Sequence, residues 1–259
     1  MMADTDKLLE ENPRQALTML DSLERLGGLS HEEQLHLTWN RAIAHQALGI
    51  SLAEDELLPE AIAYYRTDKY KQADSYLLEA SYLVWTGQEE NAIKAIDKGL
   101  TEVADSTKRV QLLATKANIF EHKREYQKAA AVLKEALGYG SQKREQAVLN
   151  YKLGLNLSLM GDSQSEQYFE KGISLSTENG DTAMACEFLR NYADYLSNNG
   201  QYRRSSDMYY QIAQMMPQVA ELSAVQMALA GNYINMHRLD SARICNDKAV
   251  KSEAELEAR

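Results

Sequence analysis

Apolar residues recur along most of the chain at the spacing that places them on one face of an α-helix. In the stretch REYQKAAAVLKEAL, they fall at i, i+3, i+4, i+7 and i+8, counted from Ala129. Segments such as Asn179-Gly180-Asp181 supply residues that end one helix and cap the next. The pattern predicts an all-α chain with helices over 3–10, 13–26, 31–48, 54–66, 70–86, 88–103, 106–122, 124–138, 141–160, 163–178, 181–199, 201–216, 219–236 and 238–253.

Small residues recur in every second predicted helix at a nearly constant interval. The series Ala92, Ala129, Ser165, Ser205 and Ala242 has steps of 37, 36, 40 and 37 residues. Two backward steps of 38 lead to Glu54, which breaks the pattern, and to Ala16, which keeps it. A second small-residue series, in the preceding helices, comprises Ala42, Ala80, Ala117, Gly154, Ala193 and Ala230. Because small residues let paired helix axes approach closely, the two series predict stacked antiparallel helix hairpins.

The order of small and large apolar residues within each hairpin resembles the tetratricopeptide repeat (TPR). Ala117 with Phe120 in one helix, followed by Ala129 with Leu133 in the next, shows the arrangement. The steps of 36 to 40 residues exceed the family's usual 34, and the closing proline is nearly absent. The resemblance implies an αα-superhelix, or solenoid, of about seven helix pairs in one domain over 1–259. Its units would be 3–28, 31–67, 69–104, 106–139, 141–179, 181–217 and 219–254, with a degenerate second unit.

Two segments, NPRQALTMLDSL and DELLPEAIAYYRT, resemble the TPR regions of bacterial membrane-anchored regulators. That resemblance implies the sensory or docking region of a larger regulatory protein on the periplasmic side of a membrane; without it, a cytoplasmic location is expected. The chain begins Met1-Met2 and ends in KSEAELEAR without an evident polar capping helix, which fits a part of a longer protein. Alternatively, polar residues after Cys245 make the last helix its own cap.

Charge and composition exclude several classes of protein. The chain has 28 Lys and Arg against 38 Asp and Glu, a formal net charge of −10, so it lacks the broad positive field that binds nucleic acid. It contains no apolar run of 18 residues and no signal-peptide pattern at its start. We therefore expect neither a nucleic-acid partner nor a membrane span within these residues.

Each apparent chemical motif fails a spacing test. His31 and His36 are five residues apart, about 140° around a helix, whereas a helical zinc pair needs i and i+4. Gly138-Tyr139-Gly140 and Gly161-Asp162-Ser163 lack the preceding strand that a nucleotide loop or a nucleophilic serine requires. Cys186 and Cys245 are 59 residues apart, so they form no metal knuckle, and either two buried thiols or one disulfide remains open. The sequence thus predicts no catalytic residue, no metal and no cofactor.

In the TPR family the first helices of the hairpins line a concave groove. Carried over to this chain, the resemblance implies a partner-binding groove that contains Trp39, Asp74, Leu77, Trp85, Asn118, Glu121, Tyr151, Glu187, Arg190 and Asp194, with Met227 and Asn235 among further positions. The two tryptophans are either exposed anchors or packed between repeats. The acidic residues either select a partly basic partner or form an ordinary solvated face. Only Arg190 and its neighbour Asn191 can contact a peptide carboxylate, so a multi-residue carboxylate clamp is not expected.

The resulting hypothesis is a non-enzymatic scaffold that holds a protein or peptide in its groove, as the sensory or docking region of a bacterial regulator. A peptide-switched, phosphatase-like regulator of a response regulator is the alternative from the enzyme class. It requires an additional N-terminal helical bundle, for which residues 1–30 offer only one helix pair. A stand-alone adaptor and an oligosaccharide-uptake component are further alternatives. The sequence leaves the partner and the oligomeric state open.

Overall fold

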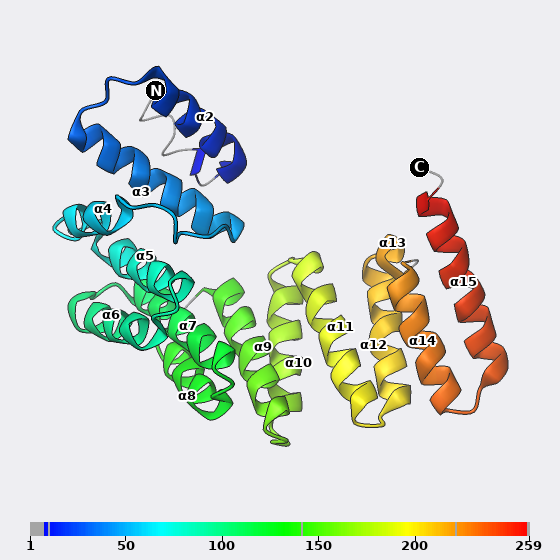
Figure 1. Cartoon of the computed structure of the whole chain (residues 1–259). Coiled ribbons are helices and arrows are strands. Elements are labelled where there is room, and N and C mark those ends of the chain that lie inside the picture. Colours follow the sequence, from blue (N-terminus) through cyan, green and yellow to red (C-terminus); the bar gives the residue numbers. More distant parts are fainter. Residues whose placement is uncertain (1–7, 10, 141, 221, 258–259) are drawn as a thin grey trace. The chain divides into compact units, whose positions relative to one another are not determined.

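The computed structural model describes residues 8–9, 11–140, 142–220 and 222–257, and every regular element in this part of the chain is an α-helix (Figure 1). The predicted all-α, helical-repeat class is therefore confirmed. Contacts divide the chain into two compact units, Met1–Gly140 and Ser141–Arg259. This boundary lies between two predicted repeats and cuts neither of them. The predicted helix 3–10 lies largely outside the described residues.

The first unit is a succession of antiparallel helices in which each helix contacts the next one along the chain (Figure 1). Its helices are α2 (Pro13–Leu26), α3 (His31–Leu48), α4 (Leu58–Tyr65), α5 (Gln72–Trp85), α6 (Glu89–Glu102), α7 (Ser106–His122) and α8 (Tyr126–Leu137). Helix α7 also contacts α5, the first helix of the preceding hairpin. This stacking of consecutive hairpins is the arrangement expected of a helical repeat.

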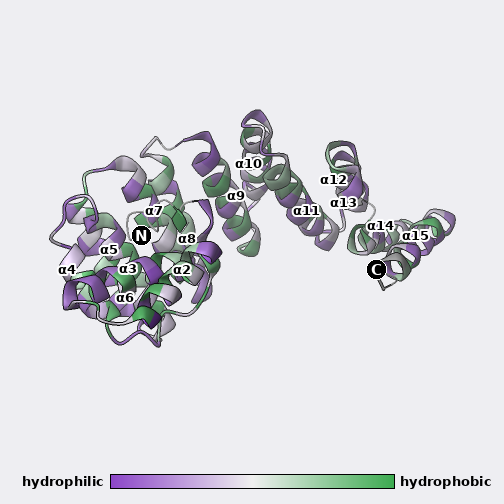
Figure 2. Ribbon diagram, turned by 90° about the horizontal axis from the view of Figure 1, so that it is seen from above, coloured by the Kyte–Doolittle hydropathy of each residue, from purple (hydrophilic) through white to green (hydrophobic). Residues whose placement is uncertain are grey.

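The second unit repeats the same arrangement (Figure 1). Its helices are α9 (Lys143–Leu159), α10 (Ser165–Glu178), α11 (Thr182–Asn198), α12 (Tyr202–Met215), α13 (Pro217–Ala220), α14 (Ser223–Asn235) and α15 (Leu239–Glu257). Hydrophilic and hydrophobic residues alternate around the helices of both units (Figure 2). This amphipathic pattern lets each helix bury one face against its neighbours.

Helix α4 begins later than the sequence pattern predicts. Asp55 forms a turn, in which its carboxylate accepts a hydrogen bond from the Leu57 amide at 3.2 Å, and Pro59 then occupies the first turn of the helix. Glu54, which the 38-residue step places at the small-residue position, is exposed in that turn. Ala61, which is fully buried, belongs instead to the cluster that contains Ala42.

The start of α14 also differs from the prediction, and here too a proline is the cause. Pro217 disfavours a helical conformation in the residue before it, and Met216 has φ −141° and ψ 80°. The chain forms the short helix α13 before α14 begins at Ser223. The predicted helix over 219–236 is therefore divided into the end of α13 and α14.

The small residues of both predicted series are buried. Two glycines show how closely paired helices approach: Gly99, which lies outside the two series, and Gly154, which belongs to the second. In the first unit, Gly99 on α6 faces the ring of Tyr76 on α5, and a Cβ atom at Gly99 would lie 2.9 Å from a ring carbon. In the second unit, a Cβ atom at Gly154 on α9 would lie 3.1 Å from Phe169 on α10. At Gly99 the partner ring occupies the space of a side chain, whereas at Gly154 an added Cβ would require Phe169 to move by a few tenths of an ångström.

We expect Gly99→Ala to reduce the free energy of unfolding by about 1–3 kcal/mol, because Tyr76 is fully buried and its hydroxyl donates a hydrogen bond to Glu102 at 2.6 Å. The ring therefore has little room to move away from an added methyl group. Urea unfolding followed by circular dichroism measures the change. Lys94→Ala, at an exposed position of the same helix, is the control and should stay within about 0.5 kcal/mol of the wild type. If Gly99→Ala and the wild type are equally stable, the Tyr76 ring does have room to move away from an added methyl group, and the expectation is wrong.

Candidate functional site

The predicted groove residues lie on the first helices of the hairpins and fall into two groups, one in each unit. Those in the first unit are Trp39 on α3; Asp74, Leu77 and Trp85 on α5; and Asn118 and Glu121 on α7. Those in the second unit are Tyr151 on α9, and Glu187, Arg190 and Asp194 on α11.

Trp39 is a core residue, which corrects its assignment to an open groove. Its side chain is 4% exposed, and its ring lies against that of Tyr65 at the end of α4, with 4.7 Å between centroids. The Lys71 ammonium lies 4.0 Å from the centre of the Tyr65 ring and 5.8 Å from that of Trp39. Trp39 is therefore not an exposed anchor, and the ring that covers it comes from α4 of its own hairpin.

Trp85, at the last position of α5, is 49% exposed, as are Tyr64 and Tyr70 of the same unit to 43% and 90%. Leu77 is half-buried beside the core cluster of α5, α6 and α7. Asn118 and Glu121 are half-buried on α7, which packs against α5. Trp85 therefore fits the alternative of an exposed anchor.

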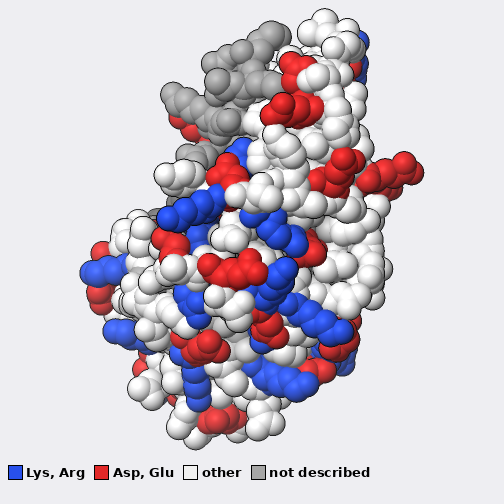
Figure 3. Space-filling model, turned by 90° about the vertical axis from the view of Figure 1, so that its left-hand side faces the viewer, with Lys and Arg blue, Asp and Glu red and all other residues white. Residues whose placement is uncertain are grey.

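The carboxylate of Asp74 is already paired within the first unit. It lies 2.6 Å from the Lys108 ammonium, and about a third of each side chain is exposed. This pairing balances the acidic charge that was expected to attract a basic partner. Lysine or arginine and acidic side chains are likewise interspersed over the face drawn in Figure 3. Charge at Asp74 therefore offers little selectivity toward a partner.

Tyr151 also belongs to the core rather than to an open groove. Its ring stacks on Phe188 of α11, with 4.0 Å between centroids and 6° between planes. Burial first, and then the negative charge of Glu187, raise the pKa of Tyr151 from 10.0 to about 12. The residue thus contributes to the stacking of α9 on α11, which corrects its assignment as a partner contact.

The neutral form of Tyr151 stabilises the fold, so we predict a loss of stability at high pH. A tyrosine whose pKa is raised on folding contributes fully below pH 10 and loses its contribution between about pH 10 and 12, because the unfolded chain ionises first. Thermal melting across this pH range measures the effect. Tyr151→Phe has no phenol to ionise and should show a shallower decrease. If the melting temperatures of the wild type and Tyr151→Phe decrease identically across this pH range, Tyr151 is not a source of the pH dependence.

Glu187, Arg190 and Asp194 are exposed along α11. Asp194 accepts a hydrogen bond from the Tyr209 hydroxyl at 2.6 Å, which fixes its position against α12. Neither Glu187 nor Arg190 forms an ion pair with any residue that the structure describes. These two side chains are therefore the charged groups on this face that are available to a partner.

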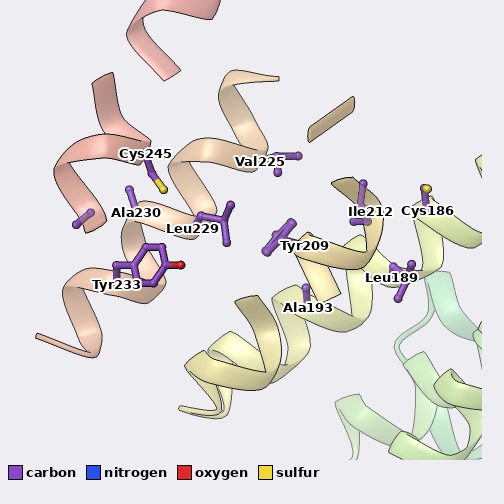
Figure 4. Packing of buried hydrophobic residues seen from close by; sticks show 11 residues of the cluster. Cys186, Leu189, Ala193, Tyr209, Ile212, Val225, Leu229, Ala230, Tyr233 and Cys245 are labelled. Carbon is purple, nitrogen blue, oxygen red and sulfur yellow. The ribbon is translucent and has the colours of Figure 1, made fainter. Parts of the chain in front are cut away.

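Glu187 and Arg190 border a cavity of about 270 Å³ between α11, α12 and α14. Its other lining residues are apolar and come from the three helices and from the residue that follows α12: Ala183, Cys186, Ile212, Met216 and Val225. Figure 4 shows Cys186, Ile212 and Val225 at the junction of these helices. The repeat pattern predicted the two charged residues but not the apolar floor, because the floor residues are separated by up to 42 positions (225 − 183) along the chain.

The described residues contain no group of three or more His, Cys, Asp or Glu side chains that could hold a metal ion. Cys186 and Cys245 are free, and burial raises the pKa of both thiols, which disfavours the reactive thiolate. Among the described helices, none combines the length and apolar character needed to cross a bilayer.

Comparison with solved structures identifies the fold as TPR-like. BtubC from P. vanneervenii matches with a TM-score of 0.67 at 15% identity, over 78% of this chain and 89% of that chain. A Rap protein complexed with Competence and Sporulation Factor matches with a TM-score of 0.60 at 14% identity, over 99% of this chain and 76% of the Rap chain. YrrB, described as a TPR protein with an unusual peptide-binding site, matches with a TM-score of 0.52 at 20% identity. The match covers 77% of this chain and 93% of YrrB. No family model and no curated protein matches the sequence.

Proposed function

We propose that this chain is a non-enzymatic scaffold whose second unit binds a peptide or a protein segment beside α11. The observation that carries the proposal is the 270 Å³ cavity, where an apolar floor adjoins two unpaired charged side chains. An apolar side chain fits the floor, and a neighbouring carboxylate fits Arg190. Few polar groups around an apolar cavity are typical of a site that orients a ligand.

The comparisons support this proposal without identifying the ligand. YrrB is described by its peptide-binding site, and the Rap protein was solved with a bound factor. Both are similar to this chain in fold only. We further propose the setting of a bacterial regulatory protein in which the repeats sense or dock a partner. Three further hypotheses stay predictions: a phosphatase-like regulator, a stand-alone adaptor and an oligosaccharide-uptake component. The periplasmic or cytoplasmic location also stays a prediction.

We expect Arg190→Glu to weaken peptide binding at least about tenfold, since it replaces an unpaired cation by an anion at the cavity rim. The probe is a peptide selected on the full chain from a random linear library displayed on phage. Its affinity is then measured by isothermal titration calorimetry. Trp85→Ala tests the first unit in the same way, with a similar loss expected for any peptide that uses that surface.

Arg203→Glu is the matched control, because Arg203 is an exposed arginine on α12 outside the cavity lining. It should bind the selected peptide like the wild type. Circular dichroism and the melting temperature should be the same for all variants. If no peptide can be selected, the scaffold proposal is wrong. If peptides bind equally to wild type and Arg190→Glu, the cavity is not their site.

A further inference from the structure

Within the part of the chain that the structure describes, the last hairpin, α14 and α15, exposes large apolar side chains. Met227 is 58% exposed and Ile234 is 55% exposed, although both are large apolar residues. With Gly231 between them, they occupy positions i, i+4 and i+7 and therefore form one stripe along α14. Helix α14 has no charged residue from Ser223 to Asn235. The chain as a whole carries a net charge of −10, so an uncharged helix with exposed apolar side chains favours contact with another apolar surface over contact with water.

Gly231 is the second observation that points to a contact. Glycine costs about 1 kcal/mol relative to alanine inside a helix. At Gly99, Gly154 and Gly172 a neighbouring ring or backbone atom lies within 3.1 Å of the place that a Cβ atom would take. Close packing therefore accounts for glycine at these three positions in spite of its lower helix propensity. At Gly231 no atom lies within 4 Å of that place. Within the described structure nothing requires glycine here, whereas close approach of another helix would require it.

The stripe continues the interface through which first helices stack on one another. Tyr151 on α9 packs on Phe188 of the next first helix. Ser197 on α11 likewise donates a hydrogen bond to Asn232 on α14 at 2.8 Å. Counted from the small residues Gly154, Ala193 and Ala230, Met227 corresponds to Tyr151 and Ile234 corresponds to Ser197. Met227 and Ile234 therefore face the side on which a further helix would stack.

Helix α15 extends the same face. Ile244 and Lys248 line a cavity together with Tyr210 of α12, so this side of α15 faces the preceding hairpin. Leu239 and Val250 are eleven positions apart, which places them on one face, about 120–140° around the helix from Ile244. Both are more than half exposed. Two adjacent helices thus present apolar residues on the side away from the preceding hairpin.

We propose that this end face, formed by Met227, Gly231, Ile234, Leu239 and Val250, binds the same face of a second copy of the chain. A two-fold crossing of α14 with its counterpart near Gly231 brings Met227 of one copy toward Ile234 of the other. Such an interface must be self-complementary, and the uncharged α14 meets that condition because no like charges face each other along the crossing. The absence of side chains at Gly231 lets the two helix axes approach closely.

Sedimentation equilibrium of the full chain over a range of concentrations tests the proposal. We expect the wild type to reach twice its monomer mass of 29.2 kDa. Ile234→Glu should raise the dimer dissociation constant at least about tenfold, because it buries a charge at the crossing. Gly231→Ala should also weaken the dimer about tenfold while raising the melting temperature of the monomer, since alanine favours the helix and only the crossing lacks room for it.

Ile244→Glu is the matched control, because Ile244 is 59% exposed but lies on the opposite side of α15. It should dimerise like the wild type. A wild type that stays monomeric at all concentrations overturns the proposal, as does a dimer that is unchanged by Ile234→Glu or weakened equally by Ile244→Glu. The readout is the mass of the chain alone, so it is independent of peptide binding at the cavity beside α11.

Discussion

Replacing Phe169 by alanine is expected to lower the free energy of unfolding by about 3–5 kcal/mol. Phe169, on α10, is fully buried. Its ring centroid lies 5.0 Å from that of Tyr192 and 5.5 Å from that of Tyr195, both on α11. The side chain thus joins two hairpins as well as the two helices of its own hairpin. Its removal leaves a cavity lined by aromatic rings that are held by their own backbones and cannot collapse to fill it.

Urea unfolding of Phe169→Ala, followed by far-ultraviolet circular dichroism, measures this loss. Phe169→Leu is the graded control, since it keeps most of the apolar volume and should cost about 1.5 kcal/mol or less. A loss of under about 1 kcal/mol in the alanine variant would show that the aromatic cluster is not a main source of stability in the second unit.

Asn232→Ala is expected to cost about 2–4 kcal/mol, because Asn232 connects three helices through buried hydrogen bonds. The side chain is 1% exposed. Its amide donates to the hydroxyls of Ser205 at 2.9 Å and Ser206 at 3.3 Å, and its carbonyl oxygen accepts from Ser197 at 2.8 Å. Truncation leaves the fully buried Ser205 hydroxyl without this partner and also removes the bonds to Ser206 and Ser197, so the loss exceeds that of a single exposed hydrogen bond.

A double-mutant cycle with Ser205→Ala separates the hydrogen bond from lost packing. We expect a coupling energy between about 0.5 and 3 kcal/mol for this pair. Asn235→Ala, at an exposed position of the same helix, should change stability by less than about 0.5 kcal/mol. Additive effects of Asn232→Ala and Ser205→Ala would show that the two side chains do not depend on each other.

The predicted helices agree with the structure to within a few residues except at two prolines. The agreement is close because each hairpin carries its own amphipathic pattern and its own small residues, such as Ala117 and Ala129, which are both fully buried. The exceptions, at the starts of α4 and α14, arise where Pro59 and Pro217 change the local backbone. A constant repeat step takes no account of such local restraints.

The candidate site was predicted less completely than the fold. Position in the repeat assigned Glu187 and Arg190 to the groove, and both are exposed, yet it gave the same assignment to Trp39 and Tyr151, which are buried. The difference depends on what the neighbouring helix carries. Tyr65 covers Trp39, and Phe188 covers Tyr151, whereas no described ring contact covers Trp85.

By itself, the sequence of this protein determined the helical repeat, because helix formation and hairpin pairing depend on apolar spacing and small residues within about forty positions of each other. Only the tertiary structure decided which of the surface candidates are available to a partner. Side chains from other helices determine three such features: the exposure of Trp85, the pairing of Asp74 with Lys108, and the cavity beside Arg190. The physical reason is that burial and charge pairing are properties of neighbours in space, which a pattern along one helix does not specify.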